Sequence, residues 1–150
     1  MRPSEVRDRV LSDHRHLSER LDRIEGLARG VLDDREPLPS TLRSEAEALL
    51  DRLAIHMAWE DLHLVPILRA ADSWGDVRTD RFAEEHREQR ELLGYVLRQL
   101  HDLDRPEDVV AGNVLDLVAL LRADIVAEES VFLDERVVRD DPVVIDLLSS

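Results

Sequence analysis

The residues best suited to chemistry form two similar sets, one in each half of the sequence. Each set has a histidine preceded by an acidic residue and, farther along the chain, two potential metal ligands spaced four residues apart. The sets are Asp13-His14 with His56 and Glu60, and Glu85-His86 with Asp124 and Glu128. Side chains four residues apart on a helix share a face, with Cβ atoms roughly 6 Å apart, so both can reach one metal centre. The repeat therefore predicts a metal site with a pseudo-twofold axis.

Four segments carry apolar residues at steps of three, four and seven, which predicts amphipathic helices. The first helix is expected from about Ser4 to about Arg29, stopping near Gly30, and Ser40 or Thr41 is expected to cap the second. The apolar stripes of the other three helices extend over residues 42–67, 82–100 and 110–131. Four helices joined by modest loops predict an all-α fold, an up-down-up-down four-helix bundle.

All the candidate ligands fall on these apolar stripes. They are His14, His56, Glu60, His86, Asp124 and Glu128. Each of the four helices thus carries an ionisable residue on its buried face. An isolated buried carboxylate costs several kcal/mol unless it is paired or bound to a metal, so this arrangement is improbable by chance. The alternative is that Glu60 and Glu128 pair with arginines across the bundle, since all twenty basic residues are Arg. The arginines map mainly to polar faces, which favours the metal site.

Other polar residues near the stripes have weaker claims to a role. His16 is about 200° round the helix from His14 and is expected at the surface. His63 could be an auxiliary ligand, although a core contact at a helix end is the simpler interpretation. His101 precedes a loop and is expected to be solvated, and Tyr95 lies off the ligand stripe. Four acidic neighbours of the ligands point away from the metal by phase, either as solvated charge or as hydrogen-bond partners of imidazoles. These are Asp13, Asp61, Glu85 and Glu129.

Composition narrows the class of protein and the kind of metal. The 150 residues suit one domain, with 43% hydrophobic and 36% charged residues, as in globular proteins. A formal net charge of -14 argues against nucleic acid and anionic membranes as partners. The chain has no cysteine, so nitrogen and oxygen donors must bind any metal, which favours iron or manganese over structural zinc. A charged N-terminus and the lack of a long apolar run predict a cytoplasmic location.

The order His, His-x-x-x-Glu, His and a second pair at the same spacing resembles the hemerythrin-like, HHE cation-binding domain. The resemblance extends from Val10 to about Arg136 and implies a single domain over residues 1–150, with the bundle at about 4–136 and a C-terminal tail at 137–150. It implies that three histidines are terminal ligands and that two glutamates bridge two irons. These are His14, His56 and His86, and Glu60 and Glu128.

Asp124 is the departure from the family pattern, because it stands where the family usually has a histidine. Aspartate binds hard metals but is shorter than histidine, so it must approach more closely or bind through water. An extra carboxylate also stabilises ferric iron. We therefore expect oxidation, peroxide chemistry or sensing to be favoured over reversible O2 carriage.

The expected function is that of a non-haem iron protein, with two Fe ions that manganese or zinc could replace, and with O2, peroxide or nitric oxide as the small ligand. One alternative is a non-catalytic module for iron or oxygen sensing or storage. A second is a degenerate bundle without metal, marked by Asp124. The sequence leaves open whether the protein is an enzyme. The apolar residues of the tail predict contact with the bundle or with a second subunit in a homo-oligomer.

Overall fold

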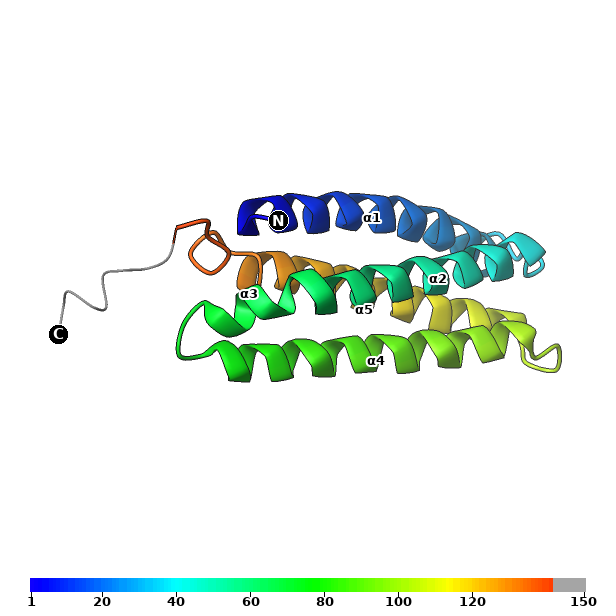
Figure 1. Ribbon diagram of the computed structural model, residues 1–150. Helices are drawn as coiled ribbons and strands as arrows, with labels where there is room; N and C mark the ends of the chain where they lie inside the picture. Colours follow the sequence, from blue (N-terminus) through cyan, green and yellow to red (C-terminus); the bar gives the residue numbers. More distant parts are fainter. Residues whose placement is uncertain (142–150) are drawn as a thin grey trace.

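The computed structural model describes residues 1–141, which form four long helices and one short helix. The bounds are α1 Pro3–Asp33, α2 Ser40–His63, α3 Val65–Ala70, α4 Gly75–His101 and α5 Glu107–Val131. Helix α1 packs on α2 and α5, and α4 packs on the same two helices, so the long helices form a closed ring of four (Figure 1). The expected all-α, up-down-up-down bundle is confirmed.

Two apolar clusters fill the bundle, one toward each end. The larger cluster contains Leu21 of α1, Leu49 of α2, Leu93 of α4 and Leu117 of α5, all nearly inaccessible to solvent. The smaller cluster has buried members on α1, on α3, on α4 and just after the ends of α2 and α5, including Val6, Val10, Leu64, Leu68, Phe82 and Phe132. Along the chain, the candidate ligands of each long helix fall between residues of one cluster and residues of the other. The helices therefore hold a polar layer between two dry apolar blocks.

Three expected helix boundaries are wrong. Helix α1 does not stop near Gly30 but continues to Asp33, and the chain turns only at Arg35, whose φ is +53°. A single glycine lowers helix stability by about 1 kcal/mol, too little to end a helix that is packed along its length. Helix α2 has Pro39 at its N-cap and no side-chain cap from Ser40 or Thr41, because the helix already begins at Ser40.

The second predicted helix is also divided in two. Helix α2 ends at His63 and α3 starts at Val65, so the apolar stripe that reaches Ile67 belongs to two helices. Pro66 explains the break, since proline has no N–H to donate and its ring collides with the preceding turn. Glu60 lies in the last turn of α2, immediately before this break.

The segment after α5 folds back on the start of α1. The Ser4 backbone N–H and hydroxyl donate to the Asp140 carboxylate at 2.8 and 2.7 Å, and Arg7 Nε donates to the Leu133 carbonyl at 2.7 Å. Val138 is buried in the smaller apolar cluster. The start of the predicted tail therefore packs on the bundle, whereas residues 142–150 lie outside the described residues. No helix in the described part of the chain is long and apolar enough to cross a membrane.

Candidate metal centre

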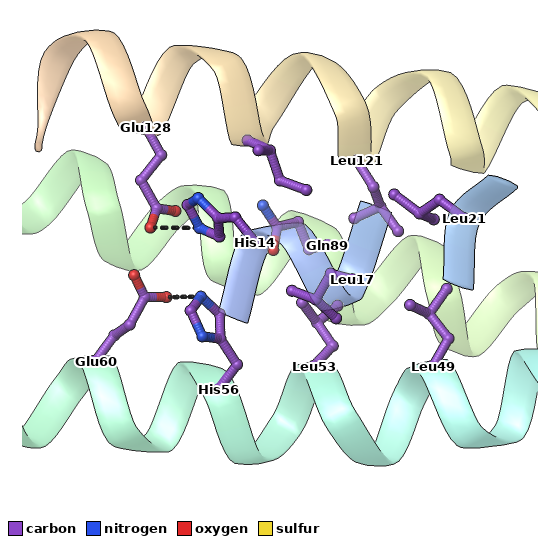
Figure 2. A pocket seen from close by; sticks show the side chains of 11 residues that line it. His14, Leu17, Leu21, Leu49, Leu53, His56, Glu60, Gln89, Leu121 and Glu128 are labelled. Carbon is purple, nitrogen blue, oxygen red and sulfur yellow. Dashed lines mark ion pairs between the residues drawn. The ribbon is translucent and has the colours of Figure 1, made fainter. Parts of the chain in front are cut away.

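Four buried side chains from three helices meet in the polar layer. His14 comes from α1, His56 and Glu60 come from α2, and Glu128 comes from α5. One potential ligand atom from each lies within 4.8 Å of the others (Figure 2). Glu60 is 0% exposed and Glu128 is 5% exposed, so both carboxylates have left bulk water. Such a cluster needs a proton or a cation to balance its charge.

Each of the three histidines turns its Nε2 atom toward a glutamate. His56 Nε2 lies 2.9 Å from Glu60 Oε1, and His86 Nε2 lies 3.3 Å from the same oxygen. His14 Nε2 lies 3.2 Å from Glu128 Oε1. Glu60 thus contacts imidazoles of two different helices, which is the placement expected of a carboxylate shared between two sites.

The two glutamates influence each other strongly. Burial raises the pKa of Glu128 well above its usual value, and the neighbouring Glu60 carboxylate raises it further. Burial also opposes ionisation of Glu60, but its contacts with Glu128, His56 and His86 outweigh burial and lower its pKa. Within this pair, therefore, Glu128 is the carboxyl that gains a proton more readily, and Glu60 is the one that loses it more readily.

The histidines respond to the same charges. Burial lowers the pKa of His14, and the nearby His56 lowers it further. Burial acts in the same direction on His56, but contacts with Glu60 and Asp13 outweigh it and raise its pKa. His14 is therefore the imidazole more readily kept neutral, the form that binds metals.

The donor atoms fit a cation better than they fit one another. His56 Nε2, both oxygens of Glu60 and Glu128 Oε1 are buried without a hydrogen-bond partner among the described residues. They approach one another closely, as the distances show, but not along hydrogen-bonding directions. Buried polar atoms are usually satisfied, and unsatisfied atoms that converge on one point call for a bound ion. Nitrogen and carboxylate donors suit iron, manganese or zinc.

The six predicted ligands are not equally placed. The structure brings together His14, His56, Glu60 and Glu128, with His86 at the edge of the group through Glu60. The remaining residue, Asp124, is half-buried, and its Oδ2 accepts a hydrogen bond of 3.1 Å from Gln89 Nε2. Asp124 lies outside the group of four.

Gln89 falls on the apolar stripe predicted for the third long helix, but no pattern in the sequence assigned it a role at the site. It is 6% exposed, three residues after His86, and belongs to the buried face of α4. Its burial was predictable from that position. Its hydrogen bond to Asp124 was not, because that contact joins two helices far apart in the sequence.

The alternative pairing with arginines is wrong for the described residues. The ion pairs of Glu60 and Glu128 all involve histidines. The other histidines are as expected: His16 is exposed, exposed His101 pairs with Glu47 at 3.0 Å, and half-buried His63 lies against Trp59 with ring centroids 4.6 Å apart.

One of three comparisons with known proteins matches this chain. The family model described as the hemerythrin HHE cation-binding domain matches residues 6–135, which include all four long helices almost completely and every candidate ligand. Searches of curated proteins and of solved structures gave no match. The match covers far more than half of the chain and coincides with a buried cluster of histidines and glutamates. The chain therefore belongs to the hemerythrin HHE cation-binding domain family.

Proposed function

We propose that the protein holds a non-haem iron pair and uses it to bind or react with O2, peroxide or nitric oxide. The observation that carries the proposal is the set of buried, unsatisfied donor atoms on Glu60, Glu128 and His56, which converge without hydrogen-bonding one another. His14, His56 and His86 would bind as nitrogen ligands, with Glu60 and Glu128 shared between two ions and Asp124 completing the second position. Iron at this position would supply one-electron redox chemistry and a coordination position for a small ligand.

A small cavity beside the cluster supports a ligand of two or three atoms. Its volume is about 20 Å³, and its lining combines the group of four ligands with leucines such as Leu17, Leu21 and Leu53 (Figure 2). A space of this size holds about one water-sized molecule. The leucines give the cavity an apolar wall opposite the polar cluster.

The chain's own groups prepare the site for cations. Glu60 and Glu128 supply negative charge in a dry environment, where it attracts a cation more strongly than it would in water. Because burial and Glu60 raise the pKa of Glu128, a cation competes with a proton at this carboxyl, since ligands bind metals in their deprotonated form.

Anaerobic reconstitution with ferrous iron tests the proposal. We expect between one and two iron atoms per chain by elemental analysis, and a change in the optical spectrum on adding nitric oxide. Less than a tenth of an equivalent of iron after reconstitution would contradict it and favour a bundle stable without metal. Manganese or zinc held in preference to iron would contradict the identity of the metal alone.

A non-catalytic sensing or storage module is the second candidate, because the buried group of His14, His56, Glu60 and Glu128 would hold a metal equally well in such a module. Turnover of hydrogen peroxide separates the two candidates. An enzyme converts many equivalents of peroxide per chain over the metal-free control, whereas a sensing or storage module reacts about once.

A further inference from the structure

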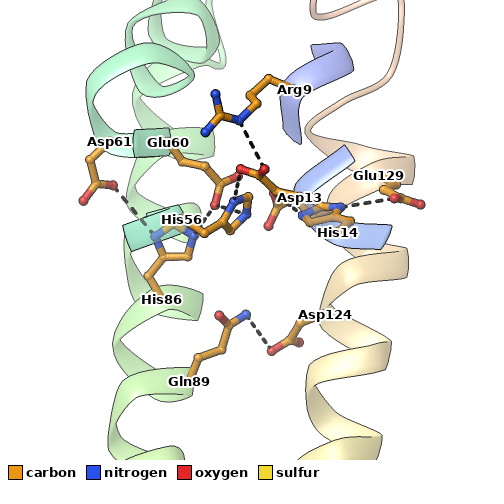
Figure 3. A network of polar contacts seen from close by, with 11 residues as sticks. Arg9, Asp13, His14, His56, Glu60, Asp61, His86, Gln89, Asp124 and Glu129 are labelled. Carbon is orange, nitrogen blue, oxygen red and sulfur yellow. Dashed lines mark hydrogen bonds and ion pairs between the residues drawn. The ribbon is translucent and has the colours of Figure 1, made fainter. Parts of the chain in front are cut away.

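Three carboxylates outside the cluster contact the outward-facing nitrogens of the three histidines (Figure 3). Asp13 Oδ2 lies 3.1 Å from His56 Nδ1, and Glu129 Oε1 lies 3.1 Å from His14 Nδ1. Asp61 Oδ1 lies 3.8 Å from His86 Nδ1, too far for a direct hydrogen bond. The sequence predicted each of these residues to be either solvated or bonded to an imidazole, and the structure shows that two of them are bonded.

These contacts follow one rule around the bundle. Each carboxylate is adjacent in sequence to a candidate ligand on its own helix and reaches the imidazole of the neighbouring helix. The contacts run from α1 to α2, from α2 to α4, and from α5 to α1, and these three helix pairs pack directly on each other. Among the four packed pairs of long helices, only α4 and α5 lack a contact between a carboxylate of one helix and an imidazole of the other.

Glu85 occupies the place of the missing carboxylate. It precedes His86 on α4, as Asp13 precedes His14 on α1, and the corresponding position on α5 is residue 124. That residue is an aspartate, whose side chain offers no N–H for Glu85 to bond. Glu85 is half-buried on α4, which packs directly on α5. Asp124 has turned to the Gln89 amide.

We propose that Asp13, Glu129 and Asp61 are positioning residues that orient the three imidazoles, and that Glu85 is a fourth positioning residue left without its imidazole. The proposal rests on the proposed metal-binding function. These roles explain why acidic residues flank the ligands in both halves of the chain. The one helix pair that lacks a carboxylate–imidazole contact is then α4 and α5.

A carboxylate at Nδ1 acts on the metal through the ring. It accepts the Nδ1–H, which selects the tautomer with a free Nε2 lone pair, fixes the ring plane and increases its basicity. Asp13 is the best placed, because its side chain is only 24% exposed and its other oxygen accepts from Arg9 Nε at 3.2 Å. Glu129 is 39% exposed and Asp61 is 58% exposed, so their influence is more strongly screened by water.

The test measures Co²⁺ affinity by competition with a chelator, together with the visible spectrum of the bound Co²⁺. Asp13→Ala and Glu129→Ala should each weaken binding by about 10–100-fold, the usual cost of losing such a partner. Asp61→Ala should cost less than either. Asp13→Asn should recover part of the affinity, because the amide oxygen still accepts the Nδ1–H. Asp8→Ala, an exposed change on the same helix, is the matched control.

The outcomes separate this proposal from the proposed function. If the parent protein binds no Co²⁺ or iron, the proposed function fails and the positioning roles fail with it. If the parent binds and Asp13→Ala matches Asp8→Ala in affinity and spectrum, only the positioning role is wrong. Thermal melts without metal identify a merely structural role, since Asp13→Ala would then lose the same stability with and without Co²⁺.

A double-mutant cycle tests the role of Glu85 at the interface of α4 and α5. Glu85→Gln is made in the parent and in Asp124→His, where the new imidazole would have Glu85 as its partner. We expect Glu85→Gln to reduce Co²⁺ affinity by about tenfold more in the Asp124→His background than in the parent. An equal effect in both backgrounds would show that Glu85 does not serve position 124.

Discussion

The α1–α2 half and the α4–α5 half carry the same pattern of residues but contribute unequally to the site. His14, His56 and Glu60 of the first half all belong to the buried cluster. In the second half only Glu128 belongs to it, while His86 lies at its edge and Asp124 bonds to Gln89. A repeat that is symmetric in sequence has produced an asymmetric site.

Side-chain length explains why Asp124 lies outside the cluster. An imidazole extends its Nε2 well beyond Cγ, so a histidine can reach the middle of the layer from the wall of the bundle. Aspartate ends two bonds after Cβ, and here the nearest donor is the Gln89 amide across the α4–α5 interface. We therefore expect the two metal positions to differ in affinity, with the weaker one beside α4 and α5.

Removing Glu60 is expected to have the largest effect, because this one carboxylate serves both halves. Glu60→Ala should weaken metal binding more than 100-fold, since it removes the oxygen that contacts both His56 and His86. The stabilisation by metal, about 2.7 kcal/mol when free metal is 100 times its Kd, should disappear. Thermal melts of parent and variant, each with and without iron, measure this loss.

Leu49→Ala, in the apolar cluster of the same helix, is the control for Glu60→Ala. It should destabilise the protein by about 2–5 kcal/mol, equally with and without metal. If Glu60→Ala behaves in the same way, Glu60 is a buried ion-pair partner and does not join the two halves.

Stepwise metal loading tests the asymmetry directly. Titration with Fe²⁺ under anaerobic conditions should show two binding events whose Kd values differ by about tenfold or more, a gap of at least about 1.4 kcal/mol. Asp124→Ala should abolish or weaken the second event and leave the first nearly unchanged. If the two binding events of the parent have the same Kd, Asp124 binds metal as well as a histidine at that position would, and the expected asymmetry is wrong.

Asp124→His should make the ligands of the α4–α5 half more like those of the α1–α2 half. The change replaces an anionic donor by a neutral one, so the ferrous form is favoured and the reduction potential should rise. Oxidation by air should slow by about tenfold, the effect of about 1.4 kcal/mol in the barrier. A redox titration and stopped-flow absorbance measure both quantities. Unchanged potential, oxidation rate and iron content would show that residue 124 is not a ligand.

The smallest effect is expected from Gln89→Ala. Losing the amide frees Asp124 to turn toward the cluster, which should change affinity at the second metal position by a few-fold and leave the first unchanged. The hydrogen bond itself contributes only about 1 kcal/mol to stability. Gln99→Ala, which removes another buried amide of α4 bonded to α5, is a matched control outside the site.

The sequence alone determined the bundle, the family and the residues of the polar layer. Helical period placed each candidate ligand on a buried face, since burial and spacing along a single helix are local properties. It also placed Glu60 four residues from His56, and their contact at 2.9 Å follows from that spacing. The end of α1 and the break at Pro66 were misjudged because packing along the whole helix, or a single missing N–H, decides such boundaries.

Only the tertiary structure decided which side chains meet between helices. In the packed bundle, Glu60 contacts both His56 and His86. Asp13 and Glu129 bond to imidazoles on other helices, and Asp124 accepts a hydrogen bond from Gln89. Those contacts depend on the relative rotation and height of helices that are distant in sequence. Periodicity says which face of a helix is buried, but it does not say which residue of another helix lies opposite, and this is why the asymmetry of the centre was visible only once the four helices were packed.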